Sequence, residues 1–322
     1  MPDKRIAVMT SGGDSPGMNA AVRAVVRAGI QKGCEVYGIR QGFTGLLNGD
    51  IERMTTRDVS GIIQRGGTML QTARNLEFKT PQGQKLGLRR LNEHGIEGLV
   101  VIGGDGSLRG ALALHNLNFP AIGVPGSIDN DIWGTDMSIG VDTALNTILD
   151  ALDRLRDTAS SHERAFIVEV MGRNCGYLAV VGGILGGAEM TLIPEVPYNI
   201  EDLVAQIDDA YVRGKNHCII VAAEGAQPDC RAVYDYLSQQ DTGFEIRLTV
   251  LGHIQRGGRP TAFDRLLATR MGVAAVDLLL EGVSGEMVAL SGREIKHIPI
   301  EVAVSKQRTV SEEYVGLAEM LD

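Results

Sequence analysis

The sequence predicts an α/β protein with two doubly wound, Rossmann-like domains, each built on a mainly parallel sheet covered by helices. Short apolar runs alternate with amphipathic segments along most of the 322 residues, a pattern typical of parallel sheets with crossover helices on both faces. Polar, glycine-rich loops follow the apolar runs. Hydrophobic residues make up 44% of the chain and charged residues 22%, so a sizeable core can be buried.

Twelve segments show this pattern clearly enough to be assigned as strands or helices. Runs of apolar residues, expected as strands buried on both faces, lie at 6–9, 36–39, 99–102, 121–124, 166–170 and 218–222. Amphipathic segments, expected as helices, lie at 19–32, 85–94, 108–115, 142–161, 200–213 and 262–280. No internal repeat is visible, and a domain break is expected near Gly140.

Charge and cysteine content exclude several classes of protein. A formal net charge of −9 argues against nucleic acid or an anionic membrane as the main partner. No segment is long and apolar enough for a signal peptide or a membrane helix. The cysteines show no metal-binding or CxxC spacing, so we expect free thiols and a cytoplasmic location; they are Cys34, Cys175, Cys218 and Cys230.

Five expected strands end in loops that suit a binding site. Open α/β sheets bind ligands beyond the carboxyl ends of their strands, so we expect these loops to form one composite site. Neither GxxxxGK[ST] nor GxGxxG occurs, which removes the main support for a P-loop or a dinucleotide fold. The loops are SGGDSPGMN (11–19), GGDGS (103–107), PGSIDND (125–131), MGRNCG (171–176) and EG (224–225).

The first two loops suit phosphate groups. Gly12 and Gly13 leave backbone N–H groups accessible at the start of a helix, although a glycine pair alone is more often an ordinary tight turn. In GGDGS, Asp105 is able to hold Mg²⁺ while neighbouring N–H groups hold phosphate. The alternative is that Asp105 caps a helix that begins near Ser107.

The third loop suits proton transfer. PGSIDND places Asp129 and Asp131 on one side of the chain if the loop is extended. One carboxylate can accept the proton of an attacking hydroxyl while the other orients or neutralises a metal site. The alternative is an Asx-turn with two solvated acids.

Five arginines lie in or beside loops, where a guanidinium group can bind phosphate through two hydrogen bonds. Taken singly, each is more often a solvated surface charge, and His253 alone is more often a structural histidine. The five are Arg74, Arg164, Arg173, Arg247 and Arg256.

Taken together, the loops and the helices between them resemble the bacterial ATP-dependent 6-phosphofructokinase family over most of residues 5–275; beyond about Glu281 the resemblance is less distinct. The segments that carry the resemblance, in the family's order, are SGGDSPGMNAAVR, RGGTMLQTAR, VVIGGDGS, PGSIDNDIWGTD, DRLRDTASSHER, VEVMGRNCG and VLGHIQRGG.

The resemblance implies the phosphofructokinase fold and transfer of the terminal phosphoryl group of MgATP to the C1 hydroxyl of fructose 6-phosphate, with Mg²⁺ as cofactor. It also implies a homotetramer with shared active sites. A larger domain that binds ATP and Mg²⁺ would span 1–139 plus 254–305. A smaller domain that binds fructose 6-phosphate would span 140–253 plus 306–322.

The family's functional positions carry over residue by residue. Asp129 would be the general base, and Asp105 would hold the metal. The other catalytic residues would be Arg74, Arg173, Ser127 and Asp131. The ATP-binding positions would be Gly13, Arg74, Gly104, Asp105, Gly106 and Ser107. The sugar phosphate would be bound by Ser127, Ile128, Asp129, Met171, Gly172, Arg173, Glu224, His253 and Arg256, with Arg164 and Arg247 supplied by a neighbouring subunit.

An allosteric site for a nucleoside diphosphate or phosphoenolpyruvate is also implied. Its residues would be Arg23, Arg27, Arg156, Gly187, Glu189, Arg213 and Lys215. Thr56 and Gly61 stand where well-known family members carry Arg and Asp, which puts the effector in doubt. Two further departures are Ser127, where Thr is usual, and Asn75–Leu76 in place of an aromatic-and-proline pair.

Three alternative functions have to be weighed. Pyrophosphate-dependent relatives carry an Asp and a Lys where this chain has Gly106 and Gly126; the two glycines would leave room for a nucleotide and so favour ATP. A kinase acting on NAD or a lipid shares GGDG but lacks the DND and MGR loops. A non-catalytic nucleotide sensor would have no need of a base such as Asp129.

Overall fold

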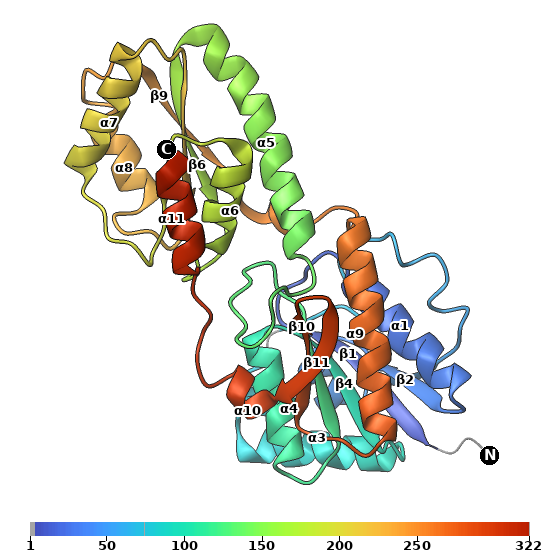
Figure 1. Ribbon diagram of the computed structural model, residues 1–322. Helices are drawn as coiled ribbons and strands as arrows, with labels where there is room; N and C mark the ends of the chain where they lie inside the picture. Colours follow the sequence, from blue (N-terminus) through green and yellow to red (C-terminus); the bar gives the residue numbers. More distant parts are fainter. Residues whose placement is uncertain (1–3, 74, 322) are drawn as a thin grey trace. The chain divides into compact units, whose positions relative to one another are not determined.

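The computed structural model describes residues 4–73 and 75–321, and the chain divides into two compact units (Figure 1). The chain passes between the units after residues 128, 131, 143, 255 and 307, whereas the sequence-based ranges placed crossings only after 139, 253 and 305. Residues 129–131 belong to the second unit, although those ranges placed them in the first domain. Unit 1 comprises Met1–Ile128, Ile132–Thr143 and Arg256–Gln307, and unit 2 comprises Asp129–Asp131, Ala144–Gln255 and Arg308–Asp322.

Unit 1 contains a seven-stranded sheet in the order β11-β10-β5-β4-β1-β2-β3. Neighbouring strands are parallel except for the β10–β11 and β2–β3 pairs at the two edges. The strands are β1 (Arg5–Ser11), β2 (Glu35–Ile39), β3 (Ile51–Met54), β4 (Gly98–Gly103), β5 (Ala121–Pro125), β10 (Glu286–Ser291) and β11 (Glu294–Pro299).

Helices cover both faces of this sheet, and each face has its own apolar core. Side chains of α1 and α9 pack on one face, with Val25, Met271 and Val100 in the same buried cluster. The other face packs against α2, α3, α4 and α10 through residues such as Phe43 and Leu108. The helices are α1 (Met18–Gln31), α2 (Gly42–Asn48), α3 (Pro81–Glu93), α4 (Asp105–His115), α9 (Ala262–Leu280) and α10 (Ile300–Ala303).

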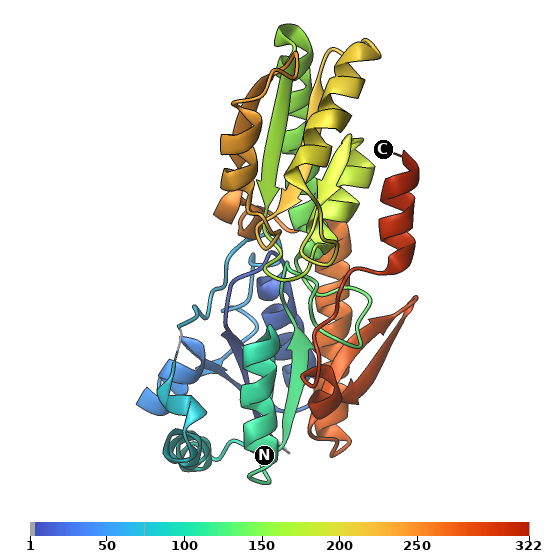
Figure 2. The ribbon, with the colours of Figure 1, turned by 90° about the vertical axis from the view of Figure 1, so that its left-hand side faces the viewer.

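Unit 2 contains a four-stranded, fully parallel sheet in the order β7-β8-β6-β9. The helix at the carboxyl end of the described chain, α11, runs beside α6, as both ribbon views show (Figure 2). The elements are α5 (Val141–His162), β6 (Arg164–Val170), α6 (Tyr177–Gly186), β7 (Met190–Leu192), α7 (Ile200–Val212), β8 (Cys218–Ala223), α8 (Cys230–Leu237), β9 (Glu245–Val250) and α11 (Glu312–Leu321); α5 begins in unit 1.

The predicted fold class is confirmed, and each of the twelve assigned segments lies in an element of the expected type. Five strands were not predicted. Strands β3 and β7 are only four and three residues long, and β9 and β11 are sheet edges with few buried residues. Strand β10 lies inside its sheet, and its buried apolar run was not assigned. Helices α2, α6, α8, α10 and α11 were also not predicted.

All four cysteines are free, as the sequence led us to expect, and all four are buried. Burial raises the pKa of the Cys175 and Cys218 thiols to about 12, so neither forms a thiolate near neutral pH. In the part of the chain that the structure describes, no helix is both long enough and apolar enough to cross a membrane.

A buried carboxylate fastens the start of α5 to the start of α9 within unit 1. Asp264 is fully buried and accepts hydrogen bonds from the backbone N–H groups of Gly140 (2.9 Å) and Thr143 (2.8 Å). The Thr143 hydroxyl donates to the same carboxylate, and Thr261 N–H donates to that hydroxyl. The chain leaves unit 1 after Thr143 and returns to it at Arg256, so this network ties an exit segment to a return segment.

Asp264 predicts a particular pH dependence of stability. Burial raises the pKa of this carboxyl from 3.8 to about 6, so the folded protein binds the proton more tightly than the unfolded chain. Its contribution to stability is therefore complete at low pH and is lost as the pH rises from about 4 through about 6. We expect the stability advantage of the wild type over Asp264→Asn to shrink by roughly 2 kcal/mol between about pH 4.5 and about pH 7.5, measured by urea unfolding. A difference in the free energy of unfolding between the wild type and Asp264→Asn that does not change with pH would contradict this role of Asp264.

Candidate active site

The GGDG loop opens helix α4 in unit 1. The helix begins at Asp105, and Gly104 occupies the N-cap position without any side-chain capping bond, so the alternative that Asp105 caps a later helix is wrong. Its carboxylate accepts a hydrogen bond from Nε of Arg109, one turn further along (2.9 Å). Another nitrogen of Arg109 donates to the carbonyl of Val304 (2.6 Å). The carboxylate of Asp105 thus faces the guanidinium group of Arg109, which Val304 holds in place.

The donor set around Asp105 fits a metal ion that is bound mainly by other oxygens. Among the described residues, no group of three or more His, Cys, Asp or Glu side chains could hold a metal by itself. A single carboxylate at a helix start suits a divalent cation that completes its shell with phosphate oxygens and water. A Cβ added at Gly106 would meet no atom within 4 Å, so there is open space beside the carboxylate.

The first glycine loop lies against the GGDG loop. Gly12 has a φ of +84°, and a Cβ there would lie 3.1 Å from Oγ of Ser107. A Cβ at Gly13 would lie 3.1 Å from Nη1 of Arg256. Unit 1 therefore brings together Gly13, Ser107 and Arg256, so that Arg256, assigned above to the sugar phosphate, is next to a position assigned to ATP.

Gly126 does not provide the space that the sequence led us to expect. A Cβ there would lie 3.0 Å from Cε of Met18 and 3.6 Å from Oγ of Ser15, both of which are buried. The missing side chain makes room for packing between β5 and the start of α1. Of the two glycines thought to admit a nucleotide, only Gly106 faces open space.

The loop after β5 continues from unit 1 into unit 2. Gly126 N–H donates to the carbonyl of Gly103 (3.0 Å), and the Cβ of Ser127 lies 3.9 Å from the point where a Cβ of Gly104 would be. Ser127 and the buried Ile128 therefore belong with the GGDG loop. Asp129 follows two residues after Ser127, so the chain itself joins the two groups of residues.

Asp129 and Asp131 are buried, with 2% and 8% exposed surface, so they are not the two solvated acids of an Asx-turn. The loop is also not extended, because Asn130 between them has a φ of +52°. Oδ2 of Asp129 lies 3.2 Å from Nε of Arg173. Within unit 2, the expected base is thus paired with an expected substrate-binding arginine.

The backbone of Arg173 is held in an unusual conformation. Its φ is +53°, in the left-handed region that non-glycine residues seldom adopt. The N–H group of Arg173 donates to Oε1 of Glu224 (2.8 Å). A Cβ at Gly225 would lie only 1.9 Å from the carbonyl oxygen of Arg173, so this close approach requires glycine. The MGR and EG loops therefore form one structure that aims Arg173 at Asp129.

Two of the assigned arginines lie on the neighbouring strands β6 and β9. Arg164, the first residue of β6, forms an ion pair with Glu245 on the neighbouring strand β9 (2.7 Å). Arg247 pairs with the same carboxylate. At about 3.3 Å per residue, β6 separates Arg164 from Met171 by roughly 20 Å. Within its own chain, Arg164 is therefore far from the MGR loop that follows β6.

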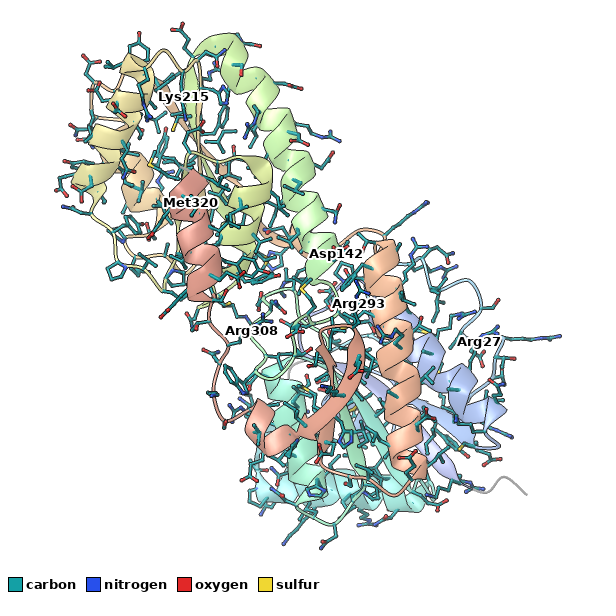
Figure 3. All side chains as sticks on the ribbon, viewed as in Figure 1. Arg27, Asp142, Lys215, Arg293, Arg308 and Met320 are labelled. Carbon is teal, nitrogen blue, oxygen red and sulfur yellow. The ribbon has the colours of Figure 1, made fainter. Side chains whose placement is uncertain are left out.

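The remaining assigned residues are placed as follows. Arg74 lies outside the described residues. His253 is exposed, on the turn after β9. Among the effector positions, Arg23 is half-buried and Arg27 is exposed on α1 of unit 1 (Figure 3). In unit 2, Gly187, Glu189 and Lys215 line one small pocket, Arg156 donates to the carbonyl of Gly187, and Arg213 pairs with Asp209.

Sequence reasoning missed several residues that contact the assigned ones, among them Arg109 and Glu245. Arg109 stands four residues after Asp105, a spacing that predicts a pair on one helix face, so it could have been found. Glu245 could not, because its contacts with Arg164 and Arg247 depend on the pairing of β6 with β9.

Comparison with known proteins gives a consistent result. A family model described as phosphofructokinase matches residues 5–279. The chain is 55% identical over 318 residues to an ATP-dependent 6-phosphofructokinase of Shouchella clausii, covering 99% of each chain. It is 54% identical over 298 residues to the enzyme of the same name from Natranaerobius thermophilus, covering 92% of each.

Solved structures agree with the fold. A Saccharomyces cerevisiae phosphofructokinase is similar with a TM-score of 0.90 and 37% identity; the match covers 99% of this chain and 50% of the yeast chain, so this chain spans about half the yeast chain's length. A pyrophosphate-dependent phosphofructokinase from Marinobacter aquaeolei has a TM-score of 0.86 at 23% identity, covering 99% of this chain and 91% of the other. At that identity the likeness shows the fold alone.

The match of the family model over most of the chain, together with these relatives at more than half identity, shows that this chain belongs to the phosphofructokinase family.

Proposed function

We propose that this protein is an ATP-dependent 6-phosphofructokinase, which transfers the terminal phosphoryl group of ATP to the C1 hydroxyl of fructose 6-phosphate and releases ADP. The observation that carries the proposal is the pairing of Arg173 with the buried Asp129. A family member without catalysis would have no need to bury a carboxylate against a strained arginine.

In the proposed reaction, Asp129 accepts the proton of the C1 hydroxyl as that oxygen attacks the terminal phosphorus of ATP. The bond from the phosphorus to the bridging oxygen of ADP breaks. Arg173 holds the carboxylate in the ionised state that can accept a proton, because a guanidinium group close to a carboxylate favours its charged form.

The nucleotide residues are proposed to be those of unit 1. Gly13, Gly104 and Ser107 present backbone and hydroxyl groups to the phosphates, and Asp105 holds a divalent cation, proposed to be Mg²⁺. When bound, this cation neutralises charge on the transferring phosphoryl group. Arg109, which pairs with Asp105, would orient that carboxylate toward the cation.

ATP is proposed as the donor because of Gly106. The fold does not select the donor, since a pyrophosphate-dependent relative shares it. Gly106 faces open space beside Asp105, whereas the Asp that pyrophosphate-dependent relatives carry there would place a negative charge next to the nucleotide phosphates.

The donor proposal predicts turnover with fructose 6-phosphate and MgATP, and no measurable turnover with pyrophosphate, in an assay coupled to formation of the bisphosphate. Gly106→Asp should raise the KM for ATP by ~10-fold or more through like-charge repulsion. Gly106→Asn, which has the same shape but no charge, is the matched control and should change it much less. Equal rates of the wild type with both donors would show that this position does not control donor choice, and ADP formation without the sugar phosphate would contradict the kinase itself.

We further propose a homotetramer in which Arg164 and Arg247 serve the active site of a neighbouring chain. The support is the distance along β6, which keeps Arg164 roughly 20 Å from Met171 in its own chain. Glu245 holds both arginines together, so that they can meet a phosphate group of a partner chain as a pair. In a closed oligomer, each chain both lends and receives these side chains.

Shared sites predict complementation between two inactive variants. Asp129→Asn and Arg164→Met should each be nearly inactive at low fructose 6-phosphate. Dissociating, mixing and reassembling them should restore a substantial fraction of activity, because some sites combine an intact Asp129 with an intact Arg164 from the other chain.

A matched control for this experiment is a mixture of Asp129→Asn with Arg173→Met. Asp129 and Arg173 pair within one chain, so no mixed site contains both intact residues and activity should stay low. Recovery in the control mixture, or no recovery with Arg164→Met despite proven mixed oligomers, would contradict the sharing of sites.

An effector site is proposed from the second group of positions. Gly187, Glu189 and Lys215 line one pocket of unit 2, where Lys215 lies 3.3 Å from Oε1 of Glu189. The proposed set also includes Arg156 and Arg213 of unit 2 and, on α1 of unit 1, Arg23 and Arg27. A nucleoside diphosphate or phosphoenolpyruvate carries the negative charge that such a set would bind.

A further inference from the structure

Gln255 is a buried polar residue in the middle of the GHIQRGG segment. Its side chain has no exposed surface. A buried amide is costly unless its polar atoms are hydrogen-bonded. Both ends of this amide have partners: Nε2 donates to the carbonyl of Gly252 (2.9 Å), and Oε1 accepts from the N–H group of Met171 (3.2 Å).

The two bonds of Gln255 differ in what they connect. Gly252 lies three residues before Gln255, within the short helix Gly252–Arg256. Met171 lies 84 residues away and is the first residue after strand β6. The amide is therefore a bridge between two loops of unit 2, the MGR loop and the turn that carries His253.

Both bridged loops contain a glycine with a positive φ. Gly172 has a φ of +138° and Gly252 a φ of +54°, conformations in which glycine loses more freedom on ordering than other residues do. At the far end of the tripeptide 171–173, the N–H group of Arg173 is held by Glu224. Gln255 holds the near end through Met171. The tripeptide is thus fixed at both ends by side chains from two different segments.

We propose that Gln255 is a positioning residue that holds the MGR loop and the His253 turn in the geometry that binds fructose 6-phosphate; this inference rests on the proposed function. Gln255 does not touch the substrate in this role. It acts through Met171 and Gly252, and its loss should weaken sugar phosphate binding while leaving the nucleotide residues of unit 1 unaffected.

The test replaces Gln255 by Met, which has a similar length but makes neither hydrogen bond. We expect the KM for fructose 6-phosphate to rise roughly ten- to hundredfold, because two bonds are lost and the buried N–H group of Met171 and the part-buried carbonyl of Gly252 each lose a partner. The KM for ATP should stay within about twofold, as removal of a positioning contact specific to one substrate requires.

Gln64→Met is the matched control. Nε2 of Gln64 also donates to a carbonyl three residues earlier, that of Gly61 (3.0 Å), but this bond lies on the exposed surface. Its loss should leave both KM values unchanged. If the two variants behave alike, or if the KM values for ATP and fructose 6-phosphate rise together in Gln255→Met, the positioning role is wrong.

Gln255→Glu keeps the proposal testable if the Met variant does not fold. A protonated glutamic acid can donate to Gly252 and accept from Met171 as glutamine does, whereas the carboxylate cannot donate. The ratio of the KM for fructose 6-phosphate of Gln255→Glu to that of the wild type should therefore fall toward one as the pH is lowered. A ratio that does not depend on pH would overturn the proposal.

Hydrogen exchange separates this inference from the proposed function. The amide proton of Met171 should exchange at least tenfold faster in Gln255→Met than in the wild type, at equal global stability, because its acceptor is gone. Unchanged exchange would overturn the bridge whatever reaction the protein catalyses. If the wild type forms no ADP with fructose 6-phosphate while Met171 exchange does accelerate, the proposed function is wrong and the bridge stands.

Discussion

The ion pair between Arg173 and Asp129 is the contact around which the loops of the second unit are arranged. A carboxylate with 2% exposed surface is unfavourable unless a partner compensates its charge, and Nε of Arg173 lies 3.2 Å away. Arg173 reaches it only because its backbone has a left-handed φ. Glu224 and the missing side chain of Gly225 maintain that conformation, so three loops of the second unit are organised around one pair.

The division of the chain into two units places the residues proposed to bind the nucleotide in one unit and most of those proposed to bind fructose 6-phosphate in the other. The glycine loops and Asp105 lie in the first unit, and the MGR, EG and His253 loops lie in the second. Two short stretches of chain join the sets: Ser127 precedes Asp129 by two residues, and Gln255 directly precedes Arg256. Within unit 1, Arg256 lies beside Gly13. The residue that directly follows Gln255 therefore lies next to the first glycine loop.

Much of the fold and most site positions could be predicted because apolar runs and loop motifs are local in sequence. Of the strands missed, β3, β7, β9 and β11 lie at sheet edges, where burial does not impose a strong pattern. Strand β10 lies inside its sheet, and its buried apolar run was not assigned. The left-handed φ of Asn130 and Arg173 could not be predicted, because tertiary contacts hold it against local preference. Gly126 was misinterpreted for the same reason: only the structure shows that Met18 fills the space beside it.

A double-mutant cycle of Asp129→Asn and Arg173→Met on kcat, at saturating fructose 6-phosphate and MgATP, tests this pair most directly. Asp129→Asn should lower kcat by roughly 10²–10⁴-fold, the usual effect of removing a general base. If Arg173 acts by holding that base, the double variant should be little slower than the slower single variant. Losses that multiply in the double variant would show that the two residues act independently and would contradict the account.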